Sequence, residues 1–213
     1  MSAVFTFIIP FINKVSLFGE WAVSKLTYNF ECTSAGGEKT NNGNAATAGI
    51  NILLPKGFNT QIAYLYRNEN FESLYGALTY MPNRIGGRFS TGWTRSDERF
   101  SMDFFAKYLK EAESDASSDP AEYTSISAGI SFIPINNLTI RLSGLAEIQE
   151  KESEKQNLKK DSITKSATLQ SSYQIIRNNY LDFKYQFINN SDDINPKNEY
   201  DAHVFNTEIN IKF

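Results

Sequence analysis

The chain has 213 residues, of which 41% are hydrophobic and 14% aromatic, and its formal net charge at pH 7 is −3. It contains no run of about 18 apolar residues, which excludes a membrane-spanning helix, and its slight negative charge argues against a nucleic-acid partner. Because Cys32 is its single cysteine, the sequence excludes an internal disulfide, a cysteine-rich metal site and covalent haem attachment.

Alternation of apolar and polar residues predicts β-strands along most of the chain, because successive side chains of a strand point to opposite faces. The first predicted strand carries Phe5, Phe7 and Ile9 and ends at a Pro/Asn turn. The second, within 15–24, has Trp21 on its apolar face and Glu20 on the other. The further predicted strands include 48–54, 61–67, 125–132, 139–149, 167–175, 181–187 and 204–213.

The connections between these strands are of two kinds, short turns rich in Pro, Asn and Gly and long polar segments. Short turns are expected at 10–14, 55–59, 82–87, 134–137 and 177–179. Long connections are expected at 29–44, 110–121, 150–162 and 189–202. Short turns at one end and long loops at the other are typical of outer-membrane barrels. This asymmetry favours a transmembrane barrel over the alternative, a soluble β-sandwich with two stacked sheets.

The segment from Gly86 to Glu113 contains a change of parity, because Trp93 belongs to an odd-numbered apolar set and Phe100 to an even-numbered one. The change falls at 95–99 and indicates either a bulge in one long strand or a tight hairpin. We prefer the bulge, because a hairpin would place the connections 29–44 and 110–121 at opposite ends. The bulge predicts eleven strands, and the hairpin twelve.

The chain ends on the alternating segment VFNTEINIKF and the aromatic residue Phe213. This ending resembles the C-terminal signal of bacterial outer-membrane β-barrels. The resemblance implies an antiparallel up-and-down barrel of about 11–12 strands, spanning 1–213 as one domain in the outer membrane of a Gram-negative bacterium. It implies membrane lipid and lipopolysaccharide as surroundings, and a barrel-assembly machinery that recognises Phe213. We expect either a complete barrel or the C-terminal part of a larger one, because the first residues make a poor signal peptide.

Two segments carry a second, narrower resemblance. The sequences NKVSLFGEWAVSKLTYNF (13–30) and NEYDAHVFNTEINIKF (198–213) are similar to parts of the large barrels that sheathe multihaem cytochromes in electron conduits. This resemblance implies a periplasmic or surface multihaem cytochrome as partner. The haem would belong to that partner, and the chain itself is expected to hold no cofactor and no metal.

Few residues are candidates for chemistry. The single histidine, His203, shares its parity with Phe205, which places it on the apolar face, so we expect no enzyme. The candidate functional residues are the charges of the polar face, which would line a pore and influence its ion selectivity. They are Glu20, Arg67, Arg88, Asp103, Lys107, Arg141, Glu147, Asp182, Lys184, Glu208 and Lys212. The expected function is a passive pore or membrane scaffold; the alternatives are a cytochrome sheath and a protein that binds partners through its surface loops.

Overall fold

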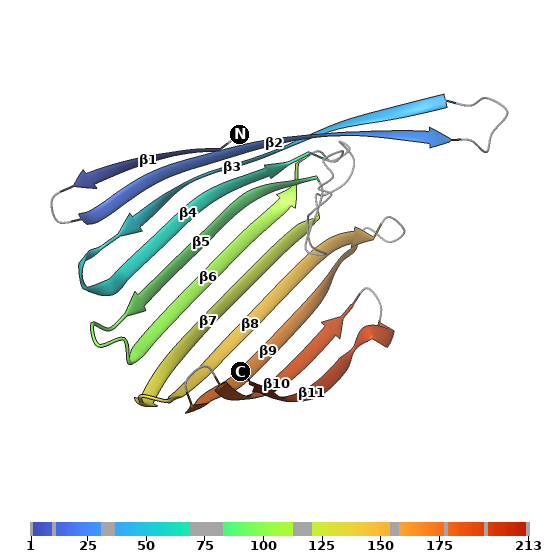
Figure 1. Ribbon diagram of the computed structural model, residues 1–213. Coiled ribbons are helices and arrows are strands. Elements are labelled where there is room, and N and C mark those ends of the chain that lie inside the picture. Colours follow the sequence, from blue (N-terminus) through green and yellow to red (C-terminus); the bar gives the residue numbers. More distant parts are fainter. Residues whose placement is uncertain are drawn as a thin grey trace.

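The computed structural model describes residues 2–9, 12–30, 37–68, 83–112, 121–153, 158–176, 179–193 and 196–211. Within these ranges, eleven antiparallel strands form one sheet in which each strand lies beside its neighbours in the chain (Figure 1). The strands are β1 Ser2–Ile9, β2 Ile12–Phe30, β3 Gly37–Leu53, β4 Phe58–Arg67, β5 Arg84–Thr94, β6 Phe100–Glu111, β7 Glu122–Ile135, β8 Leu138–Ser153, β9 Leu158–Ile176, β10 Asn179–Asp192 and β11 Tyr200–Asn210. The prediction of an all-β, up-and-down antiparallel fold is confirmed.

Two short 3-10 segments, η1 Pro55–Gly57 and η2 Pro196–Asn198, lie in connections between strands. No helix in the described part of the chain is long and apolar enough to cross a membrane.

The pairing register separates the side chains into two faces. One row of directly opposed residues crosses the sheet from β4 to β11 and is apolar throughout. It consists of Phe58, Trp93, Met102, Ile130, Leu142, Leu169, Tyr185 and Phe205. We call the face that carries this row the apolar face and the opposite one the polar face. A slip of one residue would exchange the two faces in the slipped strand, which is why the alternating pattern fixes the register.

Exposure of the two faces is the reverse of that in a water-soluble sheet. Large side chains of the apolar face are open to the surroundings: Trp21 is 50% exposed, Ile62 52% and Leu142 50%. The polar face instead carries buried residues, among them Tyr123 and Ser125. A sandwich needs two stacked sheets, and the described residues form a single sheet.

The preferred bulge at 95–99 is wrong, because this segment is a tight hairpin between β5 and β6. The amide of Glu98 donates to the carbonyl of Arg95 at 2.8 Å, and the amide of Arg95 donates to the carbonyl of Phe100 at 2.9 Å. Glu98 has a φ of 58°, a left-handed conformation that closes the turn. A turn resets the parity of the chain, which produces the same change in pattern as a bulge.

The predicted short turn at 82–87 is also wrong. Residues from Arg84 onward belong to β5, and Arg84 lies directly opposite Arg67 at the end of β4. The connection between β4 and β5 therefore runs from 68 to 83 and is long. It leaves the same end of the sheet as the connection from 112 to 121, so the hairpin at 95–99 does not disturb the separation of long and short connections.

The other predicted long connections are shorter than expected, because the strands continue through them. β2 and β3 pair as far as Phe30 and Gly37 and project beyond the rest of the sheet (Figure 1). β8 and β9 likewise pair as far as Ser153 and Leu158. Polar residues are compatible with strand pairing here, since the ladder is held by backbone hydrogen bonds and both faces can meet water.

The short connections at the opposite end are tied to one another. The indole nitrogen of Trp93 donates to the carbonyl of Lys56 at 2.9 Å, which joins the β3–β4 turn to β5. The guanidinium of Arg99 donates to the side-chain oxygen of Asn136 at 2.8 Å and joins the next two turns. Side-chain hydrogen bonds therefore hold neighbouring connections together at this end of the sheet.

The first and last strands are edges in the described structure. Among the described residues, β1 pairs with β2 alone and β11 with β10 alone. Since neighbours alternate in direction and the strand count is odd, β1 and β11 run in the same direction. Direct pairing of these two edges would therefore be parallel.

Candidate functional site: the charged polar face

The pairing register places the predicted charges on the polar face wherever the structure describes them. They are distributed over seven strands: Glu20 on β2, Arg67 on β4, Arg88 on β5, Asp103 and Lys107 on β6, Arg141 and Glu147 on β8, Asp182 and Lys184 on β10, and Glu208 on β11. Lys212 and Phe213 lie outside the described residues. The charges do not form one uniform ring, because their signs are segregated along the sheet.

One ion pair crosses the middle of the polar face. Nη2 of Arg141 donates to both carboxylate oxygens of Asp103, at 2.7 and 3.0 Å, and so joins β8 to β6. Both side chains are about half-exposed, at 39% and 45%, so the pair contributes roughly 0.2–1 kcal/mol.

Gly129 on the intervening strand β7 makes this contact possible. A Cβ atom at that position would lie 2.6 Å from Nη2 of Arg141 and 3.1 Å from Oδ1 of Asp103. Real Cβ atoms do not approach other atoms as closely as the first of these distances. A side chain at this position would therefore displace the Arg141 guanidinium from its present place above β7.

A basic cluster lies on β4, β5 and β6, close to the end with the long connections. It consists of Arg67, Arg84, Arg88 and Lys107, which line a pocket of about 220 Å³. Leu65, Phe105 and Leu109 supply the apolar part of the pocket wall. The cluster is unusual in its register, because Arg67 lies directly opposite Arg84 and Arg88 directly opposite Lys107.

Two acidic groups balance part of this positive charge. Nη1 of Arg84 lies 3.3 Å from Oε1 of Glu111, with 14% and 31% of the two side chains exposed. The Lys107 ammonium lies 4.7 Å from the centre of the Tyr123 ring. The hydroxyl of Tyr123 in turn donates to Oε1 of Glu147 at 2.5 Å. These contacts connect β5, β6, β7 and β8 on the polar face.

Arg84, Glu111 and Tyr123 are absent from the candidates predicted from sequence. Arg84 lies in a segment predicted to be a turn and Glu111 in one predicted to be a long connection, although both belong to strands. The alternating pattern could have identified them. Arg84 and Arg88 are separated by an even number of positions, as are Lys107 and Glu111, so the members of each pair lie on the same face of their strand. Once the strand boundaries are known, both residues fall on the polar face.

The charges on the last two strands form a separate group. Asp182 lies opposite Glu208, and Lys184 is the next residue of the same face on β10. Nδ2 of Asn210 donates to Asp182 at 3.3 Å. The acidic pair is thus separated from the basic cluster by several strands.

His203 lies on the apolar face, opposite Phe187. Its Nδ1 is 2.8 Å from the hydroxyl of Tyr185, and the two rings are stacked with their centres 6.0 Å apart. This position separates the single histidine of the sequence from the charged residues of the polar face. Among the described residues, no group of three or more His, Cys, Asp or Glu side chains could hold a metal ion.

On the apolar face, wherever side chains are described, charged residues lie only in the parts of the strands nearest the long connections. They are Lys25, Lys110, Glu122, Glu150, Lys165 and Asp201. Between them and the short turns lies a charge-free band, which on β4 extends from Phe58 to Tyr66 and on β9 from Ala167 to Ile175. Each run has about nine residues, the length that a tilted transmembrane strand requires.

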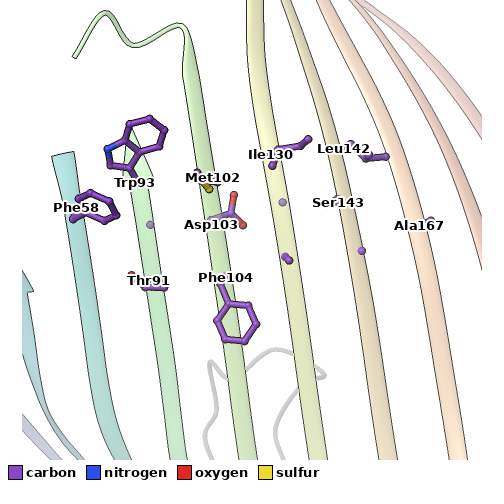
Figure 2. A pocket seen from close by; sticks show the side chains of 14 residues that line it. Phe58, Thr91, Trp93, Met102, Asp103, Phe104, Ile130, Leu142, Ser143 and Ala167 are labelled. Carbon is purple, nitrogen blue, oxygen red and sulfur yellow. The ribbon is translucent and has the colours of Figure 1, made fainter. Parts of the chain in front are cut away.

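Aromatic side chains gather at the short-turn border of this band. The ring centre of Trp93 is 5.9 Å from that of Phe58 and 5.9 Å from that of Phe100. Beside them lies an apolar hollow of about 610 Å³ (Figure 2). Small residues, Ala128, Gly144 and Ala167, leave this space open, and the side chains of Ile130 and Leu142 also line it.

No protein-family model, no curated protein and no solved structure matches this chain. The functional argument therefore rests on the two faces and their residues.

Proposed function

We propose that the chain forms a transmembrane β-barrel, or part of one, in the outer membrane of a Gram-negative bacterium. Its apolar face contacts lipid and its polar face lines a water-filled interior. The observation that carries the proposal is the inverted arrangement of the two faces, with exposed apolar side chains on one and buried polar ones on the other. Water-soluble monomers rarely expose contiguous apolar patches of more than a few hundred Å².

The placement of the charges supports the same orientation. Arg or Lys facing lipid at the bilayer midplane costs about 2–4 kcal/mol, and the cost falls towards the interfaces. The central charges Asp103 and Arg141 lie on the polar face, whereas Lys110 and Glu122 of the apolar face lie at strand ends. The aromatic group around Trp93 matches the girdles that flank the apolar band of such barrels.

Within that setting we propose a passive pore or membrane scaffold, with the long connections outside the cell and the short turns in the periplasm. Outer-membrane lipid, lipopolysaccharide and the barrel-assembly machinery are its proposed partners. Both described edges need a strand partner, because a backbone donor or acceptor left unpaired in lipid costs several kcal/mol.

Single-channel recording tests the pore. The protein would be purified from native membranes and inserted into planar bilayers. Replacing Arg141 or Glu147 by the opposite charge should change the conductance and the reversal potential in a salt gradient, because both residues lie on the polar face. Replacing the neighbouring Ile140, on the apolar face, by Val should change neither.

Insertion without any conductance would contradict the open pore. In that case, haem absorbance that purifies with the protein would support the alternative, a sheath for a multihaem cytochrome. Binding to a surface partner that is lost when the long connections are exchanged would support the loop-mediated alternative.

A further inference from the structure

We infer that the basic pocket between β4, β5 and β6 is a binding site for a small organic carboxylate with an apolar or aromatic body. The site is formed by Arg67, Arg84, Arg88 and Lys107 with the apolar wall of Leu65, Phe105 and Leu109. It goes beyond the proposed pore, because binding requires the folded sheet and does not require conductance.

The first observation is the pairing of like charges. Arg67 faces Arg84 across β4 and β5, and Arg88 faces Lys107 across β5 and β6. Like charges directly opposite each other destabilise a sheet. The Arg88–Lys107 pair therefore weakens the local structure unless an anion lies beside it.

The second observation is that the protein's own acids compensate the cluster only in part. Glu111 forms an ion pair with Arg84. Lys107 is within electrostatic range of Glu147, but also of Arg67 and Arg88, and Glu147 accepts the hydrogen bond of Tyr123. Arg84, Arg88 and Lys107 thus have two nearby acids among the described residues, and Arg88 is the cation that neither acid pairs with directly.

The third observation is a pair of buried donors. The Nε atoms of Arg84 and Arg88 are shielded from solvent and have no hydrogen-bond partner within the described structure. A guanidinium presents several N–H groups in a planar fork that matches the two oxygens of a carboxylate. A bound carboxylate would supply acceptors for donors that the described structure leaves without one.

The shape and lining of the pocket identify the ligand more closely. A volume of about 220 Å³ is below the roughly 300–1,000 Å³ of sites for drug-sized ligands, so the ligand is small. Leu65, Phe105 and Leu109 would contact the part of the ligand away from the carboxylate. Inorganic phosphate has no apolar part to cover this wall, whereas a compound such as benzoate has both a carboxylate and a ring.

The test is isothermal titration of the full chain in detergent micelles at constant ionic strength. The probes are benzoate, benzamide, which has the ring without the charge, and inorganic phosphate. We expect saturable binding of benzoate, weaker binding of phosphate and none of benzamide. Arg88→Gln should weaken benzoate binding about tenfold or more, the equivalent of roughly 1.4 kcal/mol.

The matched control is Arg141→Gln, which removes an arginine of the same face that lies outside the pocket and is already paired with Asp103. It should leave benzoate binding unchanged. Lys107→Gln serves as a second pocket variant if Arg88→Gln fails to fold. Equal effects of the pocket variants and Arg141→Gln, phosphate binding tighter than benzoate, or no benzoate binding would each overturn the inference. Conductance is recorded separately, so a closed pore with intact benzoate binding would contradict only the proposed function.

Discussion

Replacing Leu142 by arginine tests the orientation of the sheet at a single residue. Leu142 lies on β8 within the charge-free band, with half of its surface exposed on the apolar face. The next residue, Ser143, lies on the polar face beside a hollow of about 280 Å³ that Asp103 and Arg141 also line. The two positions differ in the face they occupy and share the same depth along the strand.

The expected change in the free energy of unfolding depends on the surroundings that we propose for each face. At Leu142 an arginine would enter lipid near the bilayer midplane, which costs about 2–4 kcal/mol. At Ser143 it would enter water near the Asp103 carboxylate, and exposed substitutions of this kind change stability by about 0.5 kcal/mol or less. If the apolar face met water instead, Leu142→Arg would fall into the same small range.

The assay is equilibrium unfolding by guanidinium chloride of protein inserted into phospholipid vesicles, followed by tryptophan fluorescence. We expect Leu142→Arg to lower the free energy of unfolding by at least about 2 kcal/mol and Ser143→Arg to leave it nearly unchanged. A Ser143→Arg loss equal to or larger than that of Leu142→Arg would refute the assignment of the faces.

Two further outcomes follow from the geometry. Gly129→Ala should destabilise the protein by about 0.2–1 kcal/mol, because the new Cβ would displace the Arg141–Asp103 pair. Gly144→Ala, whose Cβ would be 3.8 Å from its nearest neighbour, should change little in the same unfolding assay. A larger loss for Gly144→Ala would contradict this explanation. In a Cys32→Ser background, a cysteine at Lys197 on the long-connection end should react with a membrane-impermeant maleimide on intact cells, and one at Asn136 on the short-turn end should not. Equal labelling of both would show that the proposed topology is incorrect.

The sequence predicted the fold class and both faces because a strand has a strict two-residue period. This period assigned Leu142 and Ser143 to opposite faces before any pairing was known. It could not distinguish a bulge from a hairpin at 95–99, since both change the parity by one. The hairpin is shown by the left-handed conformation of Glu98 and by the antiparallel pairing of β5 with β6.

The alternating pattern also could not locate the strand boundaries at the long-connection end. Polar residues such as those near Phe30 and Gly37 suggest a loop when apolar alternation is the criterion, although backbone pairing continues there. The basic cluster required the register itself, because parity places Arg67 and Arg84 on one face but does not bring them opposite each other. The edges of the sheet depend on what pairs with β1 and β11, which no local pattern encodes.

The two tryptophans of the sequence offer the most direct test of the central claim, that the apolar face meets lipid. Trp21 and Trp93 both belong to the apolar face, on β2 and β5. The variant Trp93→Phe retains only Trp21, and the variant Trp21→Phe retains only Trp93. In vesicles of brominated phospholipid, the fluorescence of each remaining tryptophan should be strongly quenched, while acrylamide in the water should quench it little. A tryptophan at Gln170, on the polar face, placed in a variant without the other two, should show the opposite behaviour. Quenching of Trp21 and Trp93 by acrylamide but not by brominated lipid would contradict the account.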